Sequence, residues 1–156
     1  MEFLEKNLED IIFETDNDSL NKRGLPIRGL KLRQVKIGNY GVCDLITIER
    51  RELNSGSKSL AITVYELKRS QVTQDALIQA VRYCRGVSRW IEYNKKYTWF
   101  ESIKIRVVLI GKVSTSSDIV YIPDVTDFVS IYSYKYEFDG LRFEEISGYG
   151  LINEGF

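Results

Sequence analysis

The chain has 156 residues with 22 basic and 22 acidic side chains, and it contains no histidine. This length fits one domain with its own core, and the apolar and charged fractions are those of an ordinary globular protein. Without histidine, Ser-His-Asp and Cys-His nucleophilic sites and histidine-bound zinc are excluded, so hydrolytic chemistry would need carboxylates, lysine and a hard metal ion. No apolar run approaches membrane-spanning length, and we expect a cytoplasmic protein with no membrane partner.

The first part of the chain is predicted to form a helix and then antiparallel strands. Apolar residues recur at helical spacing over residues 2–13, and a polar break at 15–23 follows. Three strands are expected, at residues 30–37, 42–49 and 60–67. Gly38-Asn39-Tyr40-Gly41 is typical of a hairpin turn, and residues 51–59 are expected to be a solvated loop.

The apolar period becomes helical again from about Val72 to Tyr93. Strands are then expected at residues 103–113, 118–122, 128–138 and 141–146, the last two joined by the hairpin signal Asp139-Gly140. This order predicts an α/β fold, a central mixed β-sheet flanked by helices with a C-terminal β-hairpin extension. We expect a single domain over 1–156, with a core at about 1–113, a β extension at 114–146 and a loose tail at 147–156. Cys43 and Cys84 are expected to be buried and reduced.

The segment Tyr65-Glu66-Leu67-Lys68 ends the third predicted strand with an acid and a lysine on the same face. Asp44 lies in the neighbouring strand between apolar residues, where an unpaired charge is costly. Mg²⁺ or Mn²⁺ held by Asp44, Glu66 and the backbone carbonyl of Leu67 would offset that cost and activate a water for phosphodiester hydrolysis. Lys68 would orient the water, and Glu9 could complete the outer shell or hold a second ion. The alternative is a partly buried salt bridge at the end of a sheet.

The helix at 72–93 adds further candidate residues. Gln79 lies one turn before Tyr83, so both can face the sheet end that carries Lys68; the alternative for Gln79 is an ordinary exposed glutamine. A phosphate-contacting surface is expected from Arg69, Arg82, Arg85, Arg89, Lys95 and Lys96, with Tyr83 beside them. The alternative for the three helical arginines is a solvated helix face.

These residues resemble the PD-(D/E)xK nuclease superfamily, in particular RecB-like nucleases and the catalytic domain of the archaeal and actinobacterial mismatch-type endonucleases. The likeness covers roughly the first two-thirds of the chain, at E-x-x-L-E (5–9), R-Q-V (33–35), G-V-C-D-L (41–45), E-L-K-R (66–69) and A-L-x-Q-A-x-x-Y (76–83). Cys43 stands where the family has an arginine or similar residue, and no proline precedes Asp44. The N-terminal DNA-binding domain of the mismatch-type enzymes has no counterpart in these residues, so mismatch specificity is not carried over.

The resemblance implies a restriction-endonuclease-like fold with Glu9, Asp44, Glu66, Lys68 and Gln79 at a metal-dependent active site. We therefore expect a Mg²⁺-dependent DNA endonuclease, with DNA as partner and a homodimer as a second candidate assembly. A module that keeps the fold without turnover and binds nucleic acid or a protein is the alternative, and the zero net charge favours it. A purely structural α/β protein with a salt-bridged sheet rim is the third hypothesis.

Overall fold

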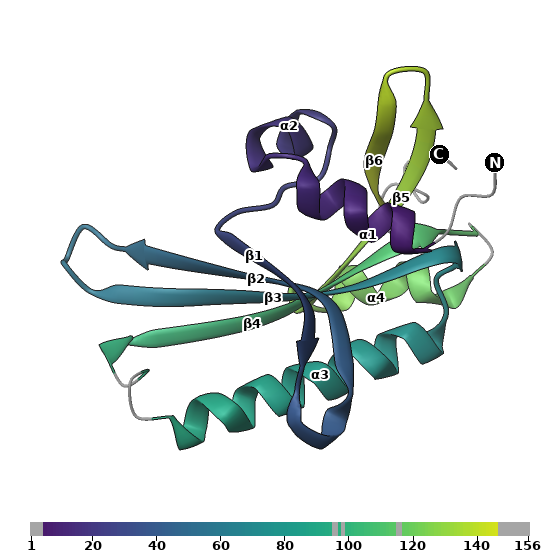
Figure 1. Ribbon diagram of the computed structural model, residues 1–156. Coiled ribbons are helices and arrows are strands. Elements are labelled where there is room, and N and C mark those ends of the chain that lie inside the picture. The colour runs from purple at the N-terminus through teal and green to yellow at the C-terminus, as the bar shows by residue number, and fades with distance from the viewer. Residues whose placement is uncertain (1–4, 95–96, 98, 115–116, 147–156) are drawn as a thin grey trace.

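A six-stranded mixed β-sheet with helices on both faces forms the centre of the molecule (Figure 1). The computed structural model describes residues 5–94, 97, 99–114 and 117–146. The strands are β1 Leu30–Lys36, β2 Val42–Glu52, β3 Lys58–Gln71, β4 Ser102–Lys112, β5 Val129–Glu137 and β6 Gly140–Ile146. The helices are α1 Glu5–Glu14, α2 Asn17–Lys22, α3 Gln74–Tyr93 and α4 Ile122–Val125, with the 3₁₀ turns η1 Gly38–Tyr40 and η3 Asp118–Tyr121.

The strands lie in the sheet in the order in which they occur in the chain. Strands β1, β2 and β3 are antiparallel neighbours, β3, β4 and β5 are parallel, and β5 and β6 are antiparallel again. Parallel neighbours need a long crossover connection, and α3 supplies it between β3 and β4. The predicted fold class, a mixed sheet flanked by helices, is therefore confirmed.

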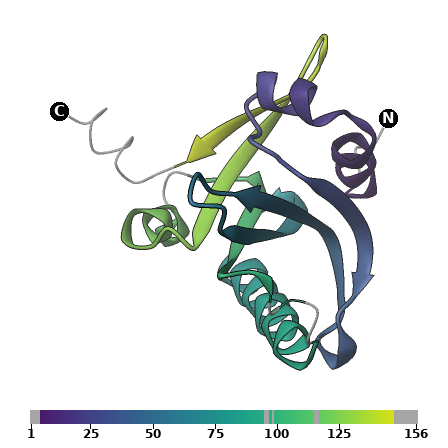
Figure 2. The same cartoon turned by 90° about the vertical axis from the view of Figure 1, so that its left-hand side faces the viewer.

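Each face of the sheet has its own apolar core. Figure 1 and Figure 2 show α1 and α2 on one side of the sheet and α3 on the other. Because strand side chains alternate, Ile62 and Val64 of β3 face α3, whereas Tyr65 and Leu67 face α1. We call the two the α3-side core and the α1-side core; Leu8 of α1 is fully buried in the latter. Within the described part of the chain, no helix combines the length and the apolar character that crossing a membrane requires.

The structure corrects several sequence-based boundaries. The strand expected at 118–122 is wrong, because Ser117 accepts a hydrogen bond from the backbone of Ile119 and begins a 3₁₀ turn that leads into α4. The polar break contains α2, which begins where the Asp16 carboxylate accepts a hydrogen bond from the Ser19 amide at 2.9 Å. The loop at 51–59 is shorter than expected because β2 and β3 extend into it, and β3 also continues beyond 67. The tail at 147–156 lies outside the described residues.

A single arginine joins the N-terminal helices to the hairpin of β5 and β6. The Arg23 guanidinium donates hydrogen bonds to the carbonyls of Asp139 at 2.6 Å and Leu141 at 3.1 Å, and the Arg23 carbonyl accepts one from the Phe143 amide at 2.8 Å. Gly24 follows with φ +97°, and a Cβ there would lie 2.1 Å from the Phe143 carbonyl oxygen. Only glycine fits this approach of two backbones.

The α1-side core can be tested with one substitution made at a buried and at an exposed position. Ile12 of α1 is fully buried, whereas Ile78 of α3 is 58% exposed. We expect Ile12→Ala to lower the free energy of unfolding by about 2–5 kcal/mol. Ile78→Ala should change it by less than about 0.5 kcal/mol. Urea denaturation measures both, and equal losses would contradict the packing of α1 on the sheet.

Candidate active site

Asp44 and Glu66 are the first residues on β2 and β3 beyond the last paired residues of the two strands. The antiparallel pairing of the two strands runs from Glu52 and Lys58 to Leu45 and Tyr65. Asp44 is the next residue on β2, and Glu66 is the next on β3. The sequence-based expectation that both carboxylates reach one end of the sheet agrees with this placement.

The regular alternation of side chains along β2 is interrupted at Asp44. Residues two apart in a regular strand share a face, yet Cys43 belongs to the α3-side core and Leu45 to the α1-side core. The neighbouring strand β1 is distorted at the same level, because Gln34 has φ +51°, a left-handed value that non-glycine residues seldom adopt. Two adjacent strands therefore rotate together beside Asp44, and such strained positions concentrate at functional sites.

Glu66 and Lys68 form the central ion pair of the site. The Lys68 Nζ lies 3.4 Å from Glu66 Oε1, and the two side chains are 33% and 7% exposed. Glu66 follows Ile62 and Val64 on the face toward α3, where an unpaired carboxylate would be strongly unfavourable. The predicted acid-lysine pair thus exists as a contact, with its lysine end open to solvent.

A β-bulge directly after Leu67 sets the direction of Lys68. Leu67 pairs with Ile110 and Gln71 pairs with Lys112, so three residues of β3 stand opposite Gly111 alone. A Cβ on Gly111 would lie only 3.2 Å from Lys68 Cβ and 3.0 Å from the Ser70 carbonyl oxygen. The nearest atom would be Val72 Cγ2 at 2.8 Å, so the missing side chain at 111 lets the bulge and Val72 pack closely against β4. Sequence reasoning missed this residue, although a glycine inside an apolar strand is itself a signal for a bulge.

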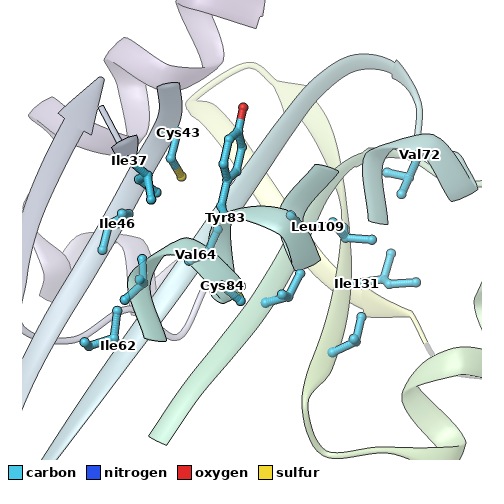
Figure 3. Packing of buried hydrophobic residues seen from close by; sticks show 14 of the residues in the cluster. Ile37, Cys43, Ile46, Ile62, Val64, Val72, Tyr83, Cys84, Leu109 and Ile131 are labelled. Atoms are coloured by element: carbon cyan, nitrogen blue, oxygen red, sulfur yellow. The ribbon is translucent and has the colours of Figure 1, made fainter. Parts of the chain in front are cut away.

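Helix α3 is attached to the start of β2 through Tyr83. Gln79 donates a hydrogen bond to the Tyr83 hydroxyl, which donates one to the Val42 carbonyl at 2.9 Å. Figure 3 shows the Tyr83 ring reaching from α3 past Cys43. Gly41, with φ +118°, lies against this ring, and a Cβ there would be 3.2 Å from Tyr83 Cε1. Tyr83 is only 5% exposed, so the structure assigns it to the core in place of the expected nucleic-acid contact.

The pKa values of the Cys43 thiol and the Tyr83 hydroxyl are both affected by the charges of Asp44 and Glu66. Burial, together with smaller effects of the charges on Glu66 and Asp44, raises the pKa of the Cys43 thiol to about 12. Burial likewise raises the pKa of the Tyr83 hydroxyl, and Glu66 and Asp44 again add to this shift while the hydrogen bond from Gln79 opposes it. Both carboxylates therefore act on the same two groups, which places them in one electrostatic environment.

Glu9 of α1 is buried and bound by two residues of β1. Its Oε1 accepts hydrogen bonds from Gln34 Nε2 at 2.8 Å and from Arg33 Nε at 3.4 Å. Arg33 also forms an ion pair with Asp10. The Glu9 carboxylate thus ties α1 to the distorted residue of β1, next to the level of Asp44.

The described residues contain no group of three or more Cys, Asp or Glu side chains arranged to hold a metal ion. The Glu9 metal ligand in the sequence-based set stays a prediction. Two carboxylates with a nearby backbone carbonyl still fit Mg²⁺, which proteins commonly hold through one or two carboxylates while water and substrate phosphate complete the shell. The carbonyl of Leu67, immediately before the bulge, is the third ligand of the sequence-based set and stays a prediction.

The expected basic surface is divided between two sides of the sheet. Arg82, Arg85 and Arg89 are exposed on α3, whose buried residues face the sheet. Arg69 is exposed at the bulge and lines a groove that α1 borders on the other side. The single continuous surface expected for these arginines is therefore wrong, because α3 and the groove occupy opposite faces. Lys95 and Lys96 lie outside the described residues.

Comparison of the chain with family models, with curated proteins and with solved structures found no match.

The two thiols provide a test of the site's burial. Cys43 and Cys84 are buried and free, and burial raises the pKa of each to about 12. Only the thiolate reacts, so at about pH 8 a thiol reagent should modify neither cysteine in the folded protein and both in urea. Because the unfolded thiols ionise from about pH 9, the free energy of unfolding should fall as the pH rises from about 9 toward 12.

The single variants Cys43→Ala and Cys84→Ala assign the labelling to one residue each. Rapid modification of the folded Cys84→Ala variant would show that Cys43 is accessible and would contradict the packing of Tyr83 against it.

Proposed function

We propose that this chain is a Mg²⁺-dependent endonuclease that hydrolyses phosphodiester bonds in DNA, with Mn²⁺ able to replace Mg²⁺. The observation that carries the proposal is the contact between Glu66 and Lys68, a nearly buried carboxylate 3.4 Å from a partly exposed ammonium group. Asp44 supplies a second carboxylate where β2 leaves β3. Two acids and one lysine at the point where the pairing of β2 with β3 ends support the resemblance to PD-(D/E)xK nucleases, and the mixed sheet with helices on both faces is compatible with it.

The residues that would hold the ion are Asp44, Glu66 and the Leu67 carbonyl. Their oxygen atoms are the hard ligands that Mg²⁺ prefers, and two carboxylates leave coordination positions for water and phosphate. When bound, Mg²⁺ polarises the phosphate and lowers the pKa of a coordinated water.

Lys68 is the residue best placed to act on the substrate directly. Its side chain is 33% exposed while Glu66 is 7% exposed, so the ammonium group lies between the buried carboxylate and solvent. From there it can orient the attacking water and stabilise the negative charge that builds on the phosphate in the transition state. The bulge opposite Gly111 fixes the backbone that carries it.

Gln79, Tyr83 and Glu9 act as positioning residues in this proposal. The hydrogen bonds from Gln79 to Tyr83 and from Tyr83 to Val42 hold the start of β2, two residues before Asp44. Glu9 holds the distorted Gln34 of the neighbouring strand at 2.8 Å. Loss of either contact would move Asp44 relative to Glu66, and small misplacements of catalytic groups are costly to rate.

A second candidate is a nuclease-fold module that binds nucleic acid or a protein without turnover. One observation favours it: Glu66 and Lys68 already neutralise each other as a partly buried ion pair, and the chain as a whole carries no net charge. This module would tolerate the loss of either charge in a binding assay and would show no metal-dependent cleavage.

The test uses circular single-stranded and circular duplex DNA, because circles have no ends and any cleavage is endonucleolytic. With Mn²⁺, the wild-type protein should convert at least one of the two circular DNAs to linear products. With a chelator, both circles should stay intact. Glu66→Gln and Lys68→Ala should each lower the rate by at least about a hundredfold. Gel electrophoresis of the time course measures the rates.

Lys58→Ala is the matched control, because Lys58 is an exposed lysine at the opposite end of β3. It should cut at the wild-type rate. Cleavage that survives the chelator, or that persists unchanged in Lys68→Ala, would rule out the proposed site.

A further inference from the structure

A large groove opens on the α1 side of the sheet at the carboxyl ends of three parallel strands. Its volume is about 1120 Å³, and α1 borders it. The end of β3 contributes Arg69, the end of β4 contributes Lys112, and β5 contributes Lys135, Tyr136 and Glu137. Pockets for single small molecules have volumes of about 300–1,000 Å³, so this groove suits an extended ligand.

The charge of the groove is positive. Arg69, Lys112 and Lys135 are exposed and come from three adjacent strands, whose backbones span roughly 10 Å at the spacing of strands in a sheet. The acid in this stretch of β5, Glu137, accepts a hydrogen bond from Arg142 Nε at 2.9 Å, which neutralises it. In a chain with equal numbers of acids and bases, such a local excess of cations selects a polyanion.

The groove also presents an aromatic ring. Tyr136 is 70% exposed, whereas Tyr134 is buried and its hydroxyl donates a hydrogen bond to the Arg69 carbonyl at 2.9 Å. Tyr134 thus holds the backbone of Arg69 at the side of the groove, and the exposed ring of Tyr136 is available for contact with a ligand. Proteins that bind single-stranded nucleic acid combine cations along the phosphate backbone with exposed aromatic rings on which the bases stack. A duplex buries its base faces and would leave Tyr136 without a stacking partner.

The groove and the candidate active site adjoin the same bulge of β3 from opposite faces of the sheet. Lys68 lies beside Glu66 on the α3 side, and the next residue, Arg69, lines the groove on the α1 side. The bulge that separates them is held between Gly111 and Tyr134. A strand bound along the groove would therefore lie beside the bulge that carries the proposed catalytic lysine on its other face.

We propose that this groove binds a single-stranded segment of DNA, so that the preferred substrate has a single-stranded portion next to the bulge of β3. The choice of DNA as ligand rests on the proposed function. Arg69, Lys112 and Lys135 contact phosphates, and Tyr136 stacks on a base.

Binding is measured by fluorescence anisotropy with an oligothymidine of about 20 nucleotides, with an abasic strand of equal length and with a blunt duplex hairpin. The protein carries Glu66→Gln, and a chelator is present, so that no strand is cut. The double variant Lys112→Gln with Lys135→Gln should raise the Kd for oligothymidine about tenfold or more and reduce the salt slope by about 1.4. Tyr136→Ala should raise it roughly tenfold for oligothymidine and leave the abasic strand unchanged.

The control double variant, Lys58→Gln with Lys104→Gln, removes the same charge from exposed residues of β3 and β4 outside the groove. It should bind oligothymidine within about twofold of the parent. Equal effects of the two double variants, tighter binding of the duplex hairpin, or an equal effect of Tyr136→Ala on the abasic strand would each overturn the groove proposal.

Cleavage of circular DNA by the groove variants in the wild-type background separates this proposal from the proposed function. If the groove proposal alone is wrong, these variants bind oligothymidine and cut circular single strands like the wild type. If the nuclease proposal alone is wrong, no variant cuts, yet oligothymidine binding still depends on Lys112, Lys135 and Tyr136.

Discussion

A carboxylate that sits almost entirely inside an apolar core is the constraint around which the rest of this structure is arranged. Glu66 is 6% exposed, and such a charge is tolerable only with a partner that is held in place. Lys68 is that partner, and its backbone is held in a bulge opposite Gly111, where a side chain would crowd the bulge. The separation of β2 from β3 then leaves Asp44 beside the pair. The left-handed residue of β1, the interrupted alternation of β2 and the bulge of β3 thus all lie near this buried charge.

Much of the fold follows from local patterns in the sequence. The helical period of α3, the turn between β1 and β2 and the Asp139-Gly140 hairpin are all signals carried by neighbouring residues, and all three elements form where they were expected. The segment 118–122 was misassigned because Ile119 and Val120 are buried from a 3₁₀ turn, and a short apolar run does not distinguish the two states. Element order along the sheet could be expected only as a class, since pairing is set by tertiary contacts.

The candidate site could be predicted as a set of residues but not as a geometry. Alternation along β3 correctly put Glu66 and Lys68 on one face, and their contact confirms it. Alternation fails at Asp44, because the left-handed backbone of Gln34 in the next strand turns both strands at that level. Helical spacing grouped the arginines of α3 with Arg69, yet spacing along one helix carries no information about which face of the sheet a bulge exposes.

The contact of Arg23 with the hairpin has a consequence for how the chain assembles during synthesis. Its hydrogen-bond acceptor at Leu141 lies 118 positions further along, and Leu20 beside it shares a core with Leu141 and Phe143. The amino-terminal helices leave the ribosome long before that hairpin exists, so they cannot complete their docking until nearly all the described chain has emerged. Contacts between such distant segments slow folding. Moving α1 and α2 to follow β6 by circular permutation would shorten this wait while keeping the same interface.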